Sequence, residues 1–304
     1  MSASRLESPA VPAPALPRVR SRVWADFLAL TKPRVNLLVL VTAVIGFHLG
    51  QEGGTPLPLL FHMVVGTFLV ASGAAVFNQV LERETDGRMR RTRQRPLPDG
   101  RIGMAEASLF AAALSAAGIL QLGLGANWLA AGVAAVTLLS YALVYTPLKR
   151  VTSLATIIGA VPGALPPVIG WAAARNALTV EAWVLFAIVF FWQMPHVLAL
   201  AWMFREDYER GGVRVLPVEE PDGRSTARQM VNYSAALVPV SLLPTVVGLT
   251  GQVYFAGALV LSLALLLLAV RFAREHSTVR VRQLFFASLG YLPVLWVLML
   301  ANRA

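Results

Sequence analysis

Three polar side chains occur at regular spacing near the end of an apolar run: Asn78, Glu82 and Asp86. Intervals of four residues place them on one face of an α-helix, with a rise of about 6 Å and a drift of about 40° per step. Carboxylate and amide oxygens suit Mg²⁺, which binds a few carboxylates together with waters and substrate phosphates. We therefore predict that these three residues hold Mg²⁺ and take part in catalysis.

A run of arginines follows these residues along the chain. Guanidinium groups bind phosphate oxygens through paired hydrogen bonds, so carboxylates that hold Mg²⁺ beside them form a clamp for a diphosphate. The alternative is a solvated helix end whose arginines mark the membrane boundary and pair with nearby acids, although acidic residues beside a bilayer are costly and tend to be functional. We predict catalysis by Arg91 and substrate binding by Arg88 and Arg95, within the run Arg88, Arg90, Arg91, Arg93 and Arg95.

A second polar cluster lies in and after the apolar run 180–203. His196 and Asp207 are eleven residues apart, close to three helical turns, which predicts a shared helix face. Pro195 is expected to bend this helix. His196 either hydrogen-bonds to a neighbouring helix or contacts a substrate. Lys149, at the end of another apolar run, either reaches a diphosphate or marks the membrane boundary.

The chain has the composition of a membrane protein. Of its 304 residues, 57% are hydrophobic and only 14% are charged, whereas an ordinary soluble domain carries about 25% charged residues. Nine apolar runs approach the roughly 20 residues that a membrane-spanning helix needs. They are 36–50, 57–81, 103–125, 127–146, 152–173, 180–203, 229–250, 252–270 and 283–301. We predict an all-α polytopic membrane protein with nine transmembrane helices around a cytoplasm-facing apolar cavity.

The basic residues support this topology. Of the 26 Lys and Arg residues, all except Arg175 and Arg303 lie in the N-terminal stretch or in alternate loops between the runs. By the positive-inside rule, the N-terminus is then cytoplasmic and the C-terminus lies outside, in a multi-pass protein of the inner (plasma) membrane. Four runs separate the two polar clusters, so both are expected on the cytoplasmic side. Because the basic residues alternate with apolar runs, the net charge of +10 indicates membrane topology and no nucleic-acid partner.

The absence of cysteine, the composition of the N-terminal residues and one Gly- and Pro-rich run allow three further inferences. The chain has no Cys, which excludes disulfides, thiolate metal sites and a Cys nucleophile. Residues 1–24 are rich in Ala, Pro, Ser and Arg and are predicted to be a disordered cytoplasmic tail before the membrane domain at 25–304. The run 152–173 contains several Gly and Pro residues. It is predicted to be kinked or partly unwound, and such breaks often line a ligand cavity.

Three strings of this sequence resemble the protohaem IX farnesyltransferase family of the intramembrane prenyltransferase superfamily, over about residue 25 to the C-terminus. An acidic helix motif alone is typical of the superfamily, whereas the first and third strings together are specific to the haem branch. The strings are Asn78-x₃-Glu82-x₃-Asp86-x₂-Met89-x-Arg91-Thr92-x₂-Arg95-Pro96-Leu97, Tyr145-Thr-Pro147-Leu-Lys149-Arg150, and Trp192-Gln193-x-Pro195-His196 continuing to Asp207-Tyr208 and Leu216-Pro217-Val218.

The resemblance implies transfer of farnesyl from farnesyl diphosphate to a vinyl group of haem b, with addition of water, to give haem O for a terminal oxidase. Haem b is then a substrate, Mg²⁺ is the cofactor, and the partners are the lipid bilayer and, as candidates, haem A synthase or oxidase assembly proteins. The resemblance also implies catalytic roles for Lys149 and Asp207, and substrate binding by Tyr145, Arg150, Trp192, His196 and Tyr208.

Two departures from the resemblance bear on the choice of acceptor. Residue 82 is Glu where many members have Asp, and the second cluster has His196, Glu206 and Asp207 in place of the several aspartates of quinone-modifying relatives. The latter difference argues against metal binding at this cluster and favours haem. The alternatives are a prenyltransferase acting on a quinone precursor or a chlorophyll-type acceptor, and a non-catalytic transporter or haem-binding membrane protein. A transporter's ionisable residues should cluster near the bilayer midplane, whereas the acidic and arginine residues of this chain are expected at the cytoplasmic edge, which argues against a transporter.

Overall fold

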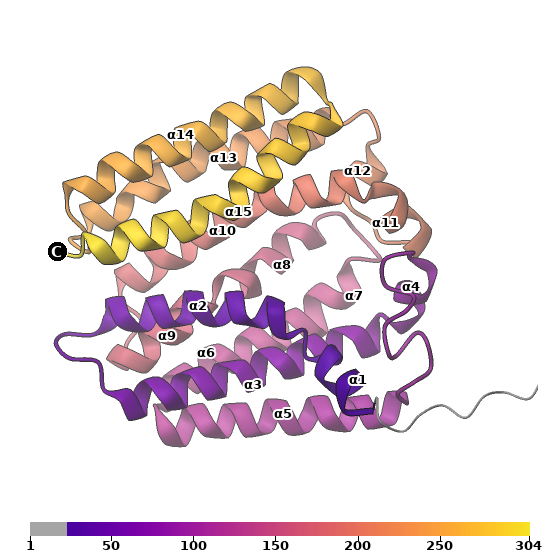
Figure 1. The fold of residues 1–304 in the computed structure, drawn as a ribbon, viewed down its shortest axis with the longest axis horizontal. Coiled ribbons are helices and arrows are strands. Elements are labelled where there is room, and N and C mark those ends of the chain that lie inside the picture. The colour runs from indigo at the N-terminus through magenta and orange to yellow at the C-terminus, as the bar shows by residue number, and fades with distance from the viewer. Residues whose placement is uncertain (1–22) are drawn as a thin grey trace, which may run out of the picture.

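A computed structural model describes residues 23–304, and these form a bundle of helices (Figure 1). The predicted tail lies outside the described residues except for Val23 and Trp24, which begin α1 (Val23–Leu30). The prediction of an all-helical membrane fold is confirmed. Long helices with apolar surfaces run alongside one another, and short helices connect them at one end of the bundle.

Eight segments are long and apolar enough to cross a membrane. A ninth long helix, α13 (Arg224–Val246), is less apolar, and it packs in the same bundle against α10 and α14. The count of nine predicted spans therefore agrees with the described helices when α13 is included. The uninterrupted spans are α2 (Pro33–Gly50), α3 (Leu57–Leu81), α5 (Met104–Gly125), α10 (Val180–Met203), α14 (Gln252–Glu275) and α15 (Thr278–Ala301).

Two spans are interrupted. One consists of α6 (Trp128–Leu139), a π-helical segment η2 (Ser140–Tyr145) and α7 (Thr146–Leu148). The other consists of α8 (Ala155–Ala164) and α9 (Pro166–Arg175), which confirms the predicted break in the run 152–173.

The break lets α9 approach α2 very closely. A Cβ atom added at Gly170 would lie 1.8 Å from the backbone oxygen of Ala43, so only glycine fits there. On the other side, Gln193 Nε2 donates a hydrogen bond of 2.7 Å to the carbonyl oxygen of Ala160 in α8. Both contacts hold the broken span against its neighbours, which gives the break a role in helix packing.

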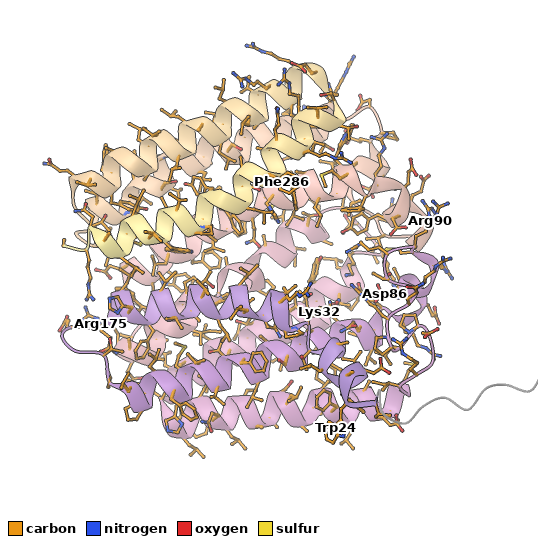
Figure 2. All side chains as sticks on the ribbon, in the orientation of Figure 1. Trp24, Lys32, Asp86, Arg90, Arg175 and Phe286 are labelled. Atoms are coloured by element: carbon orange, nitrogen blue, oxygen red, sulfur yellow. The ribbon has the colours of Figure 1, made fainter. Side chains whose placement is uncertain are left out.

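The short helices gather at one end of the bundle, which we call the charged end: α1, α4 (Arg83–Arg88), α7, α11 (Arg205–Gly211) and α12 (Leu216–Glu219) with their connecting loops (Figure 1). Lys32, Asp86 and Arg90 lie at this end, and Arg175 lies at the opposite end (Figure 2). Both predicted polar clusters therefore share one end of the bundle. That this end faces the cytoplasm stays a prediction.

Candidate active site

A cavity of about 200 Å³, which we call the polar cavity, opens at the charged end among several helices. Its walls combine polar, acidic and aromatic side chains from α3, α4, η2 and α11 with basic side chains from the turns and loops between helices, and its floor is formed by residues of α8 and α10. Among the predicted site residues, the structure brings together Asn78, Glu82, Asp86, Arg91, Arg95, Tyr145, Lys149 and Tyr208 in its lining.

Asn78, Glu82 and Asp86, the first cluster, face this cavity, but they do not lie on one continuous helix. Glu82 has φ −102° and ψ 7°, so α3 ends at Leu81 and α4 starts at Arg83. The prediction of an unbroken helix is wrong because the chain leaves helical geometry at Glu82. The amide of Asp86 still donates a 2.7 Å hydrogen bond to the Glu82 carbonyl oxygen, which keeps the three side chains on the same wall.

Each side chain of the first cluster meets a partner from another element. Asn78 Oδ1 accepts a hydrogen bond of 3.2 Å from Lys32 Nζ, and Asn78 Nδ2 donates one of 3.2 Å to Thr146 Oγ1. Glu82 forms an ion pair with Lys149. These contacts join the end of α3 and the residue after it to the turn before α2 and to both ends of α7, so the cluster connects segments distant in the sequence.

Asp86 is almost completely buried, with 1% of its surface exposed, and its Oδ2 lies 2.7 Å from Arg95 NH1. Arg95 belongs to the segment 89–103 between α4 and α5, which we call the arginine loop. Thr92 Oγ1 donates a 2.8 Å hydrogen bond to the Asp86 carbonyl oxygen, which folds the loop back over α4. The guanidinium of Arg95 is thereby held next to the acidic side chains, as a diphosphate clamp requires.

Lys32 is a site residue that the sequence analysis missed. It lies between α1 and α2 with a left-handed backbone (φ 48°), followed by Pro33 at the first position of α2. This turn directs its ammonium group into the polar cavity. Burial and, next, the nearby Arg95 guanidinium lower the pKa of Lys32 to about 8. The only sequence signal was a basic residue directly before a proline at the start of a span.

Lys149 lies in the polar cavity, which favours the first of the two interpretations of this residue. Its ammonium nitrogen is 5.1 Å from the ring centroid of Tyr145, within the range of a cation–π contact. Burial, followed by the charges of Lys32 and Arg150, lowers the pKa of Lys149 to about 7. Two cations that repel each other in one cavity are suited to an anionic ligand with several charges.

Aromatic rings form another wall of the polar cavity. Tyr141 and Tyr145 both belong to η2, and their ring centroids lie 5.4 Å apart. Tyr208 of α11 faces the same space. Tyr141 was missed by the sequence analysis because an ordinary helix was expected there, and π-helical turns are frequent at functional sites. Val197 and Ala201 of α10 complete the apolar floor.

The second cluster is arranged differently from the prediction. Helix α10 ends at Met203, and Phe204, with φ −113° and ψ 22°, separates it from α11. His196 and Asp207 therefore do not share a helix face, and that prediction is wrong. Asp207 accepts hydrogen bonds from the backbone amides of the arginine loop, at 2.8 Å from Arg90 and 3.3 Å from Arg91.

His196 lies at the contact between α10 and α15, outside the lining of the polar cavity. Its Nδ1 is 2.8 Å from Ser288 Oγ, and its ring is stacked between Trp192 and Phe285, with centroid distances of 5.4 and 4.7 Å. Trp192 Nε1 donates to the Ser288 carbonyl oxygen at 2.8 Å. The hydrogen bond to a neighbouring helix is therefore present, and a substrate contact stays a prediction.

Two predicted substrate-binding arginines also lie outside the polar cavity. Arg88 is exposed at the end of α4. Arg150 is exposed as well, and its NH2 group donates a 3.0 Å hydrogen bond to the carbonyl oxygen of Leu81, at the end of α3. The structure thus gives Arg150 a contact that supports α3, and a direct role of either residue in substrate binding stays a prediction.

The chemistry of the first cluster fits a magnesium ion that binds together with a substrate. Within residues 23–304, no group of three or more His, Cys, Asp or Glu side chains gathers as a metal site. The polar cavity instead offers two carboxylates and one amide oxygen, all buried, beside several cations. Mg²⁺ commonly binds through one or two carboxylates, waters and substrate phosphates, so this small set of oxygen ligands is sufficient.

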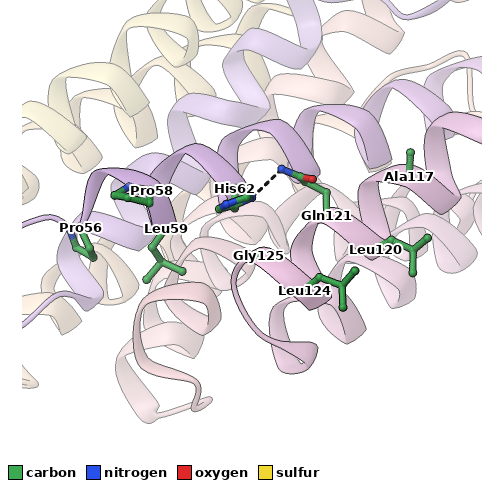
Figure 3. Close-up of a pocket in the computed structure, with 9 residues that line it drawn as sticks. All are labelled: Pro56, Pro58, Leu59, His62, Ala117, Leu120, Gln121, Leu124 and Gly125. Carbon is green, nitrogen blue, oxygen red and sulfur yellow. Dashed lines mark hydrogen bonds between the residues drawn. The ribbon is translucent and has the colours of Figure 1, made fainter.

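Two larger hollows lie elsewhere. One, of about 550 Å³, adjoins the polar cavity and is lined by Arg90, Arg205 and neighbouring residues. The other, of about 560 Å³, lies between α3 and α5 towards the opposite end (Figure 3). Its polar residues His62 and Gln121 are hydrogen-bonded to each other, with Nδ1 and Nε2 2.8 Å apart. It contains no charged carboxylate or arginine and offers no phosphate-binding chemistry.

Comparisons with known proteins agree with this geometry. Residues 39–290 match the profile of a family described as the UbiA prenyltransferase family. The chain is 49% identical over 287 residues to a protein of Solibacter usitatus named protoheme IX farnesyltransferase, and the match covers 91% of this chain and 98% of that protein.

Solved structures have the same fold. The chain is similar to a digeranylgeranylglyceryl phosphate synthase, with a TM-score of 0.78 and 17% identity over 92% of this chain and 98% of that one. It is also similar to a UbiA homologue of Archaeoglobus fulgidus bound to GPP and Mg²⁺, with a TM-score of 0.62 and 15% identity over 90% of this chain and 99% of that one. At these identities the likeness shows the fold alone.

Proposed function

The chain belongs to the UbiA prenyltransferase family, and from this premise we propose that it transfers farnesyl from farnesyl diphosphate to a vinyl group of haem b, giving haem O. One observation carries the proposal. In the polar cavity, the oxygen ligands of the first cluster lie beside the basic groups of Lys32, Lys149 and Arg95. Oxygen ligands for a metal next to basic groups for phosphate are what a metal-bound diphosphate requires.

The bond between C1 of the farnesyl chain and the diphosphate oxygen breaks, and its electron pair leaves with the diphosphate. C1 of the resulting allylic cation forms a bond to the terminal carbon of the vinyl group. The oxygen of a water molecule then bonds to the inner vinyl carbon and releases a proton, which leaves a hydroxyethylfarnesyl group on the haem.

The basic residues of the polar cavity stabilise the leaving group. Lys32, Arg91, Arg95 and Lys149 all line it and present charged donors to phosphate oxygens. The oxygens of the first cluster would hold Mg²⁺, which when bound supplies positive charge to the departing diphosphate. The carboxylates and basic groups pair with each other in this structure. When the substrate is bound, the carboxylates would turn to the metal and the basic groups to the phosphate oxygens.

Aromatic and apolar side chains protect the allylic cation. The rings of Tyr141, Tyr145 and Tyr208 line the polar cavity, and aromatic faces attract a cation through their quadrupole. Val197 and Ala201 form an apolar surface towards the membrane interior. Exclusion of water by these residues delays quenching of the cation until it has reacted with the vinyl group.

We place the charged end at the cytoplasmic face of the inner (plasma) membrane, because the positive-inside rule assigns the basic loops to that side. We also retain the prediction that His196 contacts haem, through the haem iron or a haem carboxylate. The hydrogen bond between its Nδ1 and Ser288 Oγ fixes the ring and leaves Nε2 available for this contact. Haem A synthase or oxidase assembly proteins, as recipients of haem O, remain candidate partners.

The direct test incubates the purified protein in lipid with haem b, farnesyl diphosphate and Mg²⁺, and measures the mass of the extracted haem. The expected product is heavier by one farnesyl group and one water, and EDTA prevents its formation. The Asp86→Ala protein in the same lipid is the matched control. If the haem stayed unmodified although Mg²⁺ and lipid were supplied, haem would be rejected as the acceptor. Prenylation of a quinone precursor under the same conditions would instead support a quinone-modifying prenyltransferase.

A further inference from the structure

We propose that the cavity of about 550 Å³ beside the polar cavity binds the two propionate carboxylates of haem b and thereby orients the vinyl groups towards the diphosphate. This inference rests on the proposed function and concerns a different set of residues. We call this space the arginine cavity. It is formed where α10 and α11 meet the arginine loop and the start of α15.

The size and position of the arginine cavity suit a second substrate. Its volume lies in the range of about 300–1,000 Å³ that small-molecule and cofactor sites occupy. Arg91 lines both cavities, so the two spaces meet at this side chain. A ligand in the arginine cavity can therefore extend to the residues that hold the diphosphate.

The charges of the arginine cavity match a dianion. Four arginines and two acidic residues line it, which leaves a formal excess of two positive charges. Asp207 is already engaged by the Arg90 and Arg91 amides and lies 3.6 Å from Arg210 NH1, which reduces its repulsion of a bound anion. The charged residues are Arg90, Arg91, Arg205, Arg210, Glu206 and Asp207.

Two guanidinium groups of the arginine cavity lie against aromatic rings. The Arg205 guanidinium carbon lies 4.8 Å from the ring centroid of Trp202, and that of Arg91 lies 5.4 Å from the ring centroid of Phe204. These contacts hold the guanidinium groups in place over the rings before a ligand binds. A cavity that combines arginines held in this way with apolar residues such as Met203 and Phe204 is suited to a flat apolar macrocycle that carries carboxylates.

The chemistry of haem b explains why this placement is productive. The two propionates and the two vinyl groups lie on opposite edges of the macrocycle. Carboxylates anchored at Arg90 and Arg205 would therefore direct the vinyl edge away from the solvent-facing rim, towards Arg91 and the polar cavity. An anionic lipid headgroup carries a charge of the same sign, and its binding can be distinguished from that of haem by experiment.

The test compares protohaem IX with its dimethyl ester, in which both carboxylates are blocked. Each is titrated by its absorbance into the full-length protein in phosphatidylcholine nanodiscs. We expect the double variant Arg90→Gln/Arg205→Gln to bind protohaem IX at least about tenfold more weakly, because two hydrogen bonds to charged groups are lost. Affinity for the dimethyl ester should be the same in both proteins. The variant should retain the wild-type KM for farnesyl diphosphate.

Arg224→Gln is the matched control, because it removes a highly exposed arginine at the same end of the bundle, outside the lining of both cavities. Equal affinity of the wild type and the double variant for protohaem IX, with wild-type turnover intact, would overturn this inference and leave the proposed function standing. Loss of co-purified phosphatidylglycerol from the double variant, without loss of haem affinity, would assign the cavity to lipid and also overturn it. A wild-type protein that neither binds nor farnesylates haem would overturn both.

Discussion

Asp86 and Asp207 occupy similar places, each in a short helix just beyond a long one at the charged end, yet they have different partners. Asp86 pairs with the side chain of Arg95, at 2.7 Å. Asp207 instead accepts hydrogen bonds from the backbone amides of Arg90 and Arg91. A side chain can exchange its partner when a ligand arrives, whereas a backbone amide is fixed by the fold.

This difference separates two uses of a carboxylate within one site. Asp86, and likewise Glu82 with its Lys149 partner, can turn to a metal when the basic groups turn to phosphate. Asp207 holds the arginine loop in the position from which Arg91 reaches both cavities. We therefore assign Asp86 to ligand binding and Asp207 to the positioning of arginines, and the assignment makes different predictions for activity and for stability.

The largest effect is expected from Asp86→Asn. The substitution keeps the size of the side chain but removes the charge that would hold the metal, so turnover should fall by about 10³-fold. Thermal stability should change little, because the freed Arg95 side chain is partly exposed and can be solvated. Turnover of haem b to haem O and the thermal unfolding midpoint in detergent are the two measurements.

Asp99→Asn provides the control for this substitution. Asp99 lies in the same arginine loop and pairs with Arg101 at 2.8 Å, but it is exposed and does not line the polar cavity. Its loss should leave turnover within about twofold of wild type, as for most surface substitutions. If Asp86→Asn also retained full turnover, the assignment of Asp86 to metal and diphosphate binding would have to be abandoned.

An intermediate loss of activity is expected from Asp207→Ala, with a larger loss of stability. Removal of the carboxylate leaves the Arg90 and Arg91 amides without their acceptor, at a cost of about 1–3 kcal/mol. Turnover should fall by about 10- to 100-fold as Arg91 loses its position. Asp207→Asn keeps one oxygen acceptor and should recover part of both losses.

A comparison of variants at the two aspartates can contradict the different roles assigned to Asp86 and Asp207. Kinetics and unfolding midpoints of the Asp207 variants would be compared with those of the Asp86 variants in the same lipid. If Asp207→Asn reduced turnover as strongly as Asp86→Asn and left stability unchanged, Asp207 would contact the ligand directly, as the sequence resemblance implies. The distinction between exchangeable and fixed partners would then be wrong.

The sequence predicted the long helices well, because apolar runs flanked by polar residues and prolines determine where a span begins and ends. The bounds of α3 and α10 agree with the predicted runs 57–81 and 180–203. The even number of runs between the two clusters also predicted correctly that both share one end, where Asp207 contacts the arginine loop that follows Asp86. These features depend on local composition and on the bilayer, which act over many residues at once.

Features that depend on a single backbone angle were not predictable in this way. Lys32 enters the site through a left-handed residue, and the common face of His196 and Asp207 is lost at Phe204. Tyr141 faces the cavity from a π-helical segment that ordinary helical spacing does not anticipate. Each depends on tertiary packing that overrides local preference, and such local departures from regular structure are common at functional sites.

The last prediction concerns the pH dependence of farnesyl diphosphate binding. It depends on Lys32, whose side chain, like that of Arg95, can exchange its present partner for phosphate. Its pKa is lowered to about 8, so the ammonium that would bind phosphate is present below that pH and is lost as the pH rises through it. The KM for farnesyl diphosphate should therefore rise above pH 8, by up to about tenfold per pH unit for one titrating group.

Lys32→Arg tests the origin of this rise, because a guanidinium stays charged throughout the range from pH 7 to 9.5. The variant should show a flatter KM profile above pH 8, even if its KM at pH 7 is higher because the larger group fits less well beside Asn78. Haem affinity, measured in parallel, should be unaffected by this substitution. An identical rise of KM above pH 8 in both proteins would assign the titration to a group other than Lys32, and a rise that begins near pH 7 would point to Lys149, whose pKa is lowered to about 7.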